Sequence, residues 1–323
     1  MFRIFIPKFY SDFNCIADAC PDTCCKDWDI VVDDETLEFY RSSGDEKLVN
    51  ALKTDSDGDV ILDFDSGVCP HLKDGLCSVQ TKYGGDKLCE TCRTFPRITQ
   101  DYTVFEERLL TLACPEAARL MIIEEPDFGF LSEKREVSGD SGYDNEFMHF
   151  LLAAREMTAE IIKKDASFEK MSEELFAFTR DVQSLVDDEV FDITELLRLD
   201  RSDKRLPERD DVFDIHRDMD VMDKNYLTLI EACRNDKMPA EINGELKRLF
   251  LYYIARYYLT AVASYDIITT VIRAYCAAVV CGALISFTKA ENDSAARAVI
   301  YQKYSKEIEH SDENEEIFRR LDI

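Results

Sequence analysis

The segments CPDTCC at residues 20–25 and LCETCRTFPR at residues 88–97 decide how the first third of this chain folds. Nine cysteines lie between Cys15 and Cys114, whereas Cys233, Cys276 and Cys281 are spread over the rest of the 323 residues. Turn-forming residues lie beside most of the nine, so short loops can bring several sulfurs around one centre. The spacing predicts a cysteine-rich metal-binding region.

The candidate metal ligands are a pool from which about four per cluster would be drawn. They are Cys15, Cys20, Cys24, Cys25, Cys69, Cys77, Cys89, Cys92 and Cys114. Zinc and iron–sulfur clusters both accept four thiolates, so spacing alone leaves the metal open. His71 is either a further ligand of a mixed zinc site or an ordinary hydrogen-bonding histidine. Adjacent cysteines rarely reach one ion, so Cys24 and Cys25 either reach different irons or one of them is free.

The pattern around the cysteines predicts short elements. We expect strands at residues 2–5, 28–32 and 60–64, where apolar residues are bounded by turn signals. A helix is expected from residue 33 or 34 to about residue 42, because acidic residues favour a helix N-terminus. Pro115 suits a first turn, so a second helix is expected there and should end before Pro126.

The remainder of the chain has the apolar spacing of amphipathic and buried helices. Residues 1–126 are therefore predicted as the cysteine-rich region with a few short strands, residues 127–144 as a glycine-containing linker, and residues 145–323 as a helical domain. The charged tail from residue 307 to 323 is expected to form a terminal helix. The predicted fold class is mainly α, with an antiparallel helical bundle after the metal-binding region.

Acidic side chains dominate the composition, because 66 Asp and Glu against 39 Lys and Arg give a formal net charge of −27. A surface of this sign repels phosphate backbones and anionic lipids, so we expect neither nucleic acid nor a membrane as partner. The most apolar segment, residues 249–287, contains Arg256, Asp266 and Arg273 and predicts buried helices. The first residues lack signal-peptide features, which predicts a cytoplasmic protein, where reduced cysteines favour metal binding over disulfides.

Five segments together resemble the flagellin lysine-N-methylase (FliB) family in order and spacing. They are CPDTCCKDWDI (residues 20–30), VCPHL (68–72), GLC (75–77), LCETCRTFPR (88–97) and LACPEAA (112–118). That family is similar in turn to YkgJ-type proteins, described as zinc- or iron-chelating. The resemblance is specific over about residues 10–125 and general beyond them.

The resemblance implies an S-adenosylmethionine-dependent protein-lysine N-methyltransferase that acts on flagellin and contains a 4Fe-4S cluster. Zinc remains the alternative metal, and the alternative function is a non-catalytic, metal-stabilised module that docks a protein partner. The oligomeric state and the catalytic residues stay open. No glycine-rich strand–loop–helix marks a Rossmann-type pocket for the methyl donor.

Two groups are candidates for chemistry beyond metal ligation. Arg93 and Arg97 lie beside the thiolates and either bind a carboxylate of the methyl donor or form ordinary salt bridges. The aromatic group of the helical part either surrounds a substrate ammonium or packs in the bundle core. This group comprises Tyr252, Tyr253, Arg256, Tyr257, Tyr258, Tyr265 and Asp266.

Overall fold

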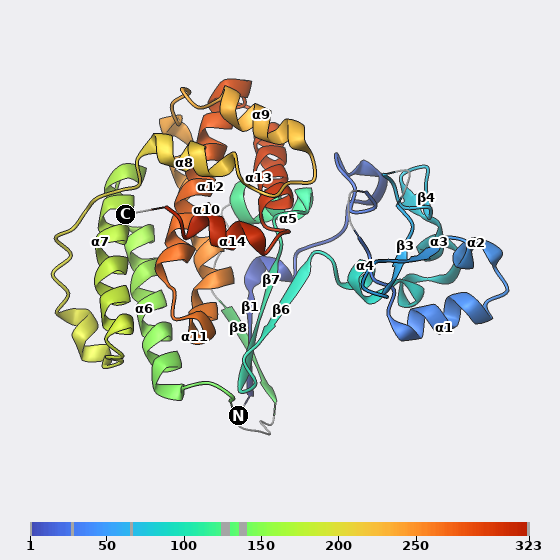
Figure 1. Ribbon diagram of the computed structural model, residues 1–323, viewed down its shortest axis with the longest axis horizontal. Coiled ribbons are helices and arrows are strands. Elements are labelled where there is room, and N and C mark those ends of the chain that lie inside the picture. Colours follow the sequence, from blue (N-terminus) through green and yellow to red (C-terminus); the bar gives the residue numbers. More distant parts are fainter. Residues whose placement is uncertain (1, 27–28, 65–66, 124–129, 136–140, 322–323) are drawn as a thin grey trace.

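The computed structural model describes residues 2–26, 29–64, 67–123, 130–135 and 141–321. Figure 1 shows two parts of unequal size. We call the part between Ile30 and Thr94 the small lobe, and the remainder, without the connecting residues 14–26, the body. Each part has its own cluster of buried apolar residues.

The body contains a four-stranded sheet in the order β6-β7-β1-β8. Strand β1 (Phe2–Pro7) pairs parallel with β7 (Phe105–Leu110) and antiparallel with β8 (Phe130–Arg135). Strand β6 (Arg97–Asp101) pairs antiparallel with β7. Because β1 precedes the small lobe and β6 follows it, the small lobe is an excursion between strands of one sheet.

The small lobe is built from short elements around a small core. Asp33 caps the first helix by accepting a hydrogen bond from the Thr36 amide at 3.0 Å, and it also accepts one from the Glu90 amide at 2.8 Å. One carboxylate thus joins the first and last helices of the lobe. Its elements are α1 (Asp34–Ser42), α2 (Glu46–Val49), β2 (Leu52–Thr54), β3 (Val60–Leu62), β4 (Leu72–Lys73), β5 (Leu76–Cys77), α3 (Ser78–Tyr83) and α4 (Glu90–Thr94).

Helices make up most of the body. The α-helices are α5 (Pro115–Ala118), α6 (Asn145–Lys163), α7 (Phe168–Asp187), α8 (Arg209–His216), α9 (Lys224–Ala232), α10 (Asn243–Tyr257), α11 (Ala261–Ser264), α12 (Ile268–Thr288), α13 (Ser294–Ile308) and α14 (Glu313–Phe318). A π-helix, η4 (Arg119–Ile123), continues α5. Short 3-10 helices of the body are η1 (Lys8–Tyr10), η5 (Ile193–Leu197), η6 (Ala240–Ile242) and η7 (Tyr258–Thr260), whereas η2 (Ala17–Ala19) lies in the connecting residues and η3 (Gly85–Lys87) in the small lobe.

Helix α12 is the centre of the body. Its length and mean hydropathy of 1.9 match those of a membrane-crossing helix, but 89% of that apolar window is buried inside the protein. Helices α10, α7 and α13 pack around it. A helix that is apolar on all sides is expected in the core of a large bundle, so the arrangement accounts for its composition.

The mainly α fold class is confirmed, and so are the strand near residue 2 and the helices beginning at Asp34 and Asn145. The helix predicted to begin at Pro115 and to end before Pro126 is present as α5 followed by the π-helix η4, which ends at Ile123. Two expectations need correction. At residues 28–32 the described part, residues 29–32, has only a bridge from Val31 to Ile61 instead of a strand. The tail is divided between the end of α13 and α14, with a break at Glu309–Asp312.

The predicted linker at residues 127–144 contains strand β8, which extends the body's sheet beside β1; residues 127–129 and 136–140 lie outside the described part. The apolar cluster of the body also includes Phe9, Leu112 and Ala117, which belong to the predicted cysteine-rich region. The buried apolar cluster of the small lobe is thus separate from that of the body. The division at residues 126 and 144 stays a prediction.

A buried histidine should make the body sensitive to mild acid. His216 Nδ1 lies 2.6 Å from the Val212 carbonyl oxygen and Nε2 lies 2.9 Å from the Tyr304 hydroxyl. A carbonyl only accepts, so Nδ1 donates to it and neutral Nε2 accepts from the tyrosine. Burial lowers the pKa of His216 from 6.5 to about 4.

The unfolded chain therefore binds a proton near pH 6.5 that the folded chain refuses until about pH 4. Stability from this group is complete above pH 6.5 and is lost as the pH falls through that window, by about 2 kcal/mol at pH 5. Urea unfolding above pH 6.5 and at pH 5 measures this loss of stability. The His216→Gln variant should lose less free energy of unfolding over the same range, and an identical loss in both proteins would contradict this assignment.

Candidate functional site: a thiol-rich junction beside a cavity

The nine cysteines of the first 114 residues are all free thiols in the structure. Cys69, Cys89 and Cys114 are buried, whereas Cys15, Cys24 and Cys92 are exposed. The remaining three, Cys20, Cys25 and Cys77, are half-buried. Local folding places them in two neighbouring groups.

The first group, which we call the small-lobe group, contains Cys69, Cys77, Cys89 and Cys92 of the small lobe together with the connecting residue Cys25. The Cys69 amide donates to the Cys25 carbonyl at 2.7 Å, and Cys77 lies opposite Leu72 in the β4–β5 hairpin. Cys89 is the N-cap residue of α4. Burial raises the pKa of Cys69 to about 12, and the neighbouring thiols of Cys25, Cys77 and Cys89 add to this rise.

At Cys89 and Cys25, hydrogen bonds between thiols lower the pKa, which is opposite to the effect of burial. The pKa of Cys89 is lowered, chiefly by a hydrogen bond with Cys92, although burial opposes the shift. A hydrogen bond with Cys24 lowers the pKa of Cys25 to about 6 against the effect of burial. A thiolate is the form that binds metal, so each pair has one sulfur in which that form is favoured.

The second group joins the connecting residues to the body and contains Cys15, Cys20, Cys24 and Cys114. Cys114 is the N-cap residue of α5, and burial raises its pKa to about 11, with smaller contributions from the nearby thiols of Cys20 and Cys15. The pKa of the Cys24 thiol is raised first by its hydrogen bond with Cys25 and by burial, and then by the thiols of Cys15 and Cys114. Cys24 also raises the pKa of Cys92, so it links the two groups.

Body helix α13 holds the connecting residues in place. Asp22 Oδ2 accepts hydrogen bonds from Gln302 Nε2 at 3.0 Å and from Lys306 Nζ at 3.2 Å. Its other oxygen pairs with Lys26 at 2.7 Å. The charge of Asp22 is thus compensated by two lysines, which keeps this half-buried carboxylate ionised.

Within the part of the chain that the structure describes, no three His, Cys, Asp or Glu side chains are placed to hold a single metal ion. His71, the candidate zinc ligand, is buried at the edge of the Tyr40 ring, with ring centroids 5.8 Å apart. Its Nε2 has no hydrogen-bond partner among the described residues. The ligand set stays a prediction, now divided between two groups.

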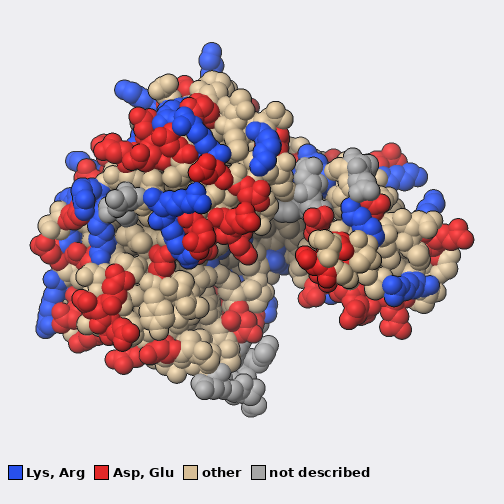
Figure 2. All heavy atoms as spheres, in the orientation of Figure 1, with Lys and Arg blue, Asp and Glu red and all other residues tan. Residues whose placement is uncertain are grey.

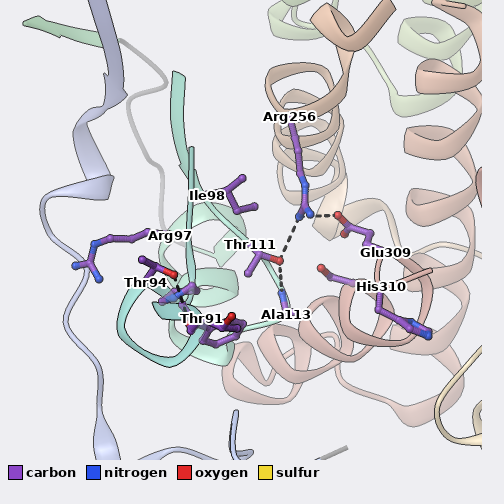
Figure 3. Close-up of a pocket in the computed structure, with 12 residues that line it drawn as sticks. Thr91, Thr94, Arg97, Ile98, Thr111, Ala113, Arg256, Glu309 and His310 are labelled. Atoms are coloured by element: carbon purple, nitrogen blue, oxygen red, sulfur yellow. Dashed lines mark hydrogen bonds and ion pairs between the residues drawn. The ribbon is translucent and has the colours of Figure 1, made fainter. Parts of the chain in front are cut away.

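A cavity of about 250 Å³ lies where α4 and the start of β6 face helices α10 and α13 of the body. Figure 3 shows it, with Thr91, Thr94 and Ile98 on one side and Arg256 and Glu309 on the other. Thr91, Thr94 and Phe95 have helical spacing and line it together. Cys89 and Cys92 share the next face of this short helix, so α4 connects the thiols to the cavity.

A buried ion pair forms the body side of the cavity. Arg256 Nη1 lies 2.9 Å from Glu309 Oε2, and the glutamate side chain is 3% exposed. The same carboxylate accepts hydrogen bonds from the hydroxyls of Tyr252 at 2.9 Å, Tyr253 at 3.0 Å and Tyr257 at 2.7 Å. Burial raises the pKa of all three tyrosines, so they remain donors. These four partners fill the roughly four acceptor sites of a carboxylate.

The aromatic group predicted from the sequence is therefore divided in space. Three tyrosines converge on Glu309, which no local sequence pattern marks as part of a site. Tyr265 instead stacks on Phe147, with ring centroids 4.8 Å apart, and Asp266 pairs with Arg319 at 2.9 Å. Thr111, which accepts a hydrogen bond from Arg256 at 3.2 Å, directly precedes the LACPEAA segment and was also missed.

Arg93 and Arg97, predicted either to bind a carboxylate or to form ordinary salt bridges, have different surroundings. Arg97 lines the cavity, but its guanidinium lies over the rings of Tyr10 and Phe13, at 5.6 and 5.1 Å from their centroids. Figure 3 shows it pointing away from the Arg256–Glu309 pair. Arg93 is exposed and is not among the described residues that line the cavity.

The chain is similar in sequence to several known proteins. It is 36% identical over 145 residues to the flagellar biosynthetic protein FliU of Salmonella muenchen, and this alignment covers 42% of the chain and 85% of that relative. The chain belongs to the FliB family. It is also 37% identical over 138 residues to lysine-N-methylases of Salmonella choleraesuis and Salmonella typhimurium.

The FliB-family match is partial for the two methylases, because it covers 40% of this chain and 34% of each of them. The chain thus spans about a third of the length of these relatives. No protein-family model matches the chain, and no solved structure matches it. The similarity to YkgJ-type proteins stays a prediction.

Proposed function

We propose that this FliB-family protein is an S-adenosylmethionine-dependent protein-lysine N-methyltransferase that acts on flagellin in the cytoplasm. The observation that carries the proposal is the double role of α4. Its N-cap residue Cys89 and its residue Cys92 belong to the small-lobe thiol group, whereas its Thr91 and Thr94 line the cavity together with Arg256 and Glu309. A thiol-rich centre and a cavity of about 250 Å³ thus meet at the junction of the two parts.

The donor chemistry of the junction fits a 4Fe-4S cluster. Thiolates are the ligands of such clusters, and the two groups together offer more than the four that one cluster needs. The ligands of a cluster are separated by the cluster's own width, so they need not converge on one ion. The small-lobe group and Cys24 would hold it, and it would supply a compact electron-accepting and electron-donating centre.

The protein's own charges suit a lysine-bearing substrate. Figure 2 shows Asp and Glu side chains over both parts and a hollow where the small lobe meets the body. With a formal net charge of −27, the surface attracts a cationic segment and raises its encounter rate. Methyl transfer needs the lysine amine without its proton and out of water, which a junction between two parts can provide.

The second candidate function is a non-catalytic module that a bound metal stabilises and that docks a protein partner. The small size of the lobe favours it, because the lobe's apolar core of nine buried residues includes Cys69 and Cys89. Small cores of this kind often depend on a metal for folding. In this case the cavity would be incidental.

The test is methyl transfer itself. Protein purified without oxygen is incubated with methyl-labelled S-adenosylmethionine and flagellin from the same cell. We expect label on lysine side chains of flagellin, located by peptide mass spectrometry. Flagellin whose lysines have been blocked by acetylation is the control and should stay unlabelled. An unlabelled native flagellin, from a protein with its metal intact, would favour the docking module.

A further inference from the structure

Arg256 lines the cavity, and one edge of its guanidinium has no partner among the described residues. In the described part of the chain, the hydrogen bonds and the ion pair of its guanidinium, to Thr111, Tyr252 and Glu309, all go through Nη1. Nε and Nη2 have no partner there, and the side chain is 16% exposed. Arginine offers two parallel N–H donors along such an edge, which match the two oxygens of a carboxylate.

The residues around Arg256 restrict the movement of its guanidinium. Glu309 neutralises Arg256 from behind, and its four partners leave it no acceptor site for a ligand. The guanidinium also lies 4.9 Å from the centroid of the Tyr257 ring. Gln100 of β6 donates a hydrogen bond to the Arg256 backbone carbonyl. A donor that is fixed before binding loses little entropy on binding.

Resting on the proposed function, we propose that Arg256 binds the α-carboxylate of the methyl donor. The Arg256–Glu309 pair is neutral overall, so a zwitterionic amino-acid end adds no net charge, whereas a simple anion would. The Ser305 hydroxyl lines the same cavity, is 2% exposed and has no partner among the described residues, so it can bond the same amino-acid end. The volume of about 250 Å³ lies just below that of ordinary ligand cavities, which suits one end of the donor.

The test compares two ligands that differ in the amino-acid end. S-adenosylhomocysteine has it and 5′-methylthioadenosine lacks it. Calorimetry on the full chain, purified without oxygen, should show tighter binding of the first. In Arg256→Lys, which keeps a cation beside Glu309 but loses the fork, S-adenosylhomocysteine should bind about tenfold more weakly and 5′-methylthioadenosine unchanged. Arg297→Lys is the matched control, because Arg297 forms a buried pair with Glu245 at 2.9 Å and does not line the cavity, and it should leave both affinities unchanged.

Each other outcome has a definite meaning. If the wild-type protein binds S-adenosylhomocysteine and Arg256→Lys keeps the full preference for it, the carboxylate site is wrong while the proposed function stands. If the wild-type protein binds neither ligand, the proposed function is wrong, and the carboxylate site that rests on it is wrong with it. Should Arg256→Lys not fold, Ser305→Ala provides the same comparison, with a several-fold loss expected for S-adenosylhomocysteine alone. An equal loss for both ligands would overturn the proposal.

Discussion

Replacing Cys89 by serine is expected to remove most of the bound metal and to abolish methyl transfer. Cys89 is 1% exposed, lies in the core of the small lobe and begins the helix that connects the thiols to the cavity. Serine preserves the size of the side chain but is a poor ligand for iron or zinc. Metal binding contributes about 10 kcal/mol to the folding of small metal-dependent domains, so the lobe should also lose its structure.

Metal content and limited proteolysis measure these two effects. Cys276→Ala is the control, because Cys276 is a fully buried thiol in α12 of the body. This variant should lose some stability to the small cavity it creates but retain its metal. A Cys89→Ser protein with wild-type metal content would show that the small-lobe thiols are not ligands.

Removing the carboxylate of Glu309 is expected to cost about 3 to 5 kcal/mol in the free energy of unfolding of the body, as for other broken buried ion pairs. Glu309→Ala leaves Arg256 charged in a site where only 16% of its side chain meets water. Three tyrosine hydroxyls lose their acceptor as well. The loss of stability arises from the unpaired Arg256 and tyrosine hydroxyls, so it exceeds the net stabilisation that the ion pair contributes.

Urea unfolding followed in the body measures this loss. The control is Asp218→Ala, which breaks a pair with Arg320 whose side chains are 67% and 61% exposed. Such surface pairs contribute less than about 1 kcal/mol, because water screens both charges. Similar losses in the two variants would contradict the description of Glu309 as a buried anchor.

Local signals explain what the sequence predicted well. Asp33 and Asp144 cap α1 and α6 through their own side chains, so both starts were visible from residues close in the chain. The apolar spacing in the last half of the chain predicted helices because most of them bury one face or all faces in one core. The concentration of nine cysteines in the first third is visible in the sequence itself, whereas the metal that they would hold stays a prediction.

Long-range pairing explains what was missed. Strand β7 reads FEERLL, and its buried Glu107 is compensated by Arg155 of α6 at 2.7 Å, 48 residues away. No local pattern shows that this charged strand is internal. Strands β1 and β7 pair although the whole small lobe lies between them in the sequence. Local apolar periodicity therefore could not predict the sheet. The same applies to the site, because Glu309 reaches Arg256 from another helix.

The structure also changes how the surplus of cysteines is understood. Spacing alone left nine candidates for about four positions. Folding places Cys25 beside Cys69, and it places Cys24 between Cys25 and Cys92 on one side and Cys15 and Cys114 on the other. We expect the true ligands of one cluster to come mainly from the small-lobe group.

The metal content of the wild-type protein tests the central claim most directly. Protein purified without oxygen is analysed for iron, acid-labile sulfide and zinc, and its visible absorption spectrum is recorded. We expect a brown protein with iron and sulfide in equal amounts and little zinc. A colourless protein that carries stoichiometric zinc, or no metal at all, would contradict the assignment of an iron–sulfur cluster to the thiol-rich junction.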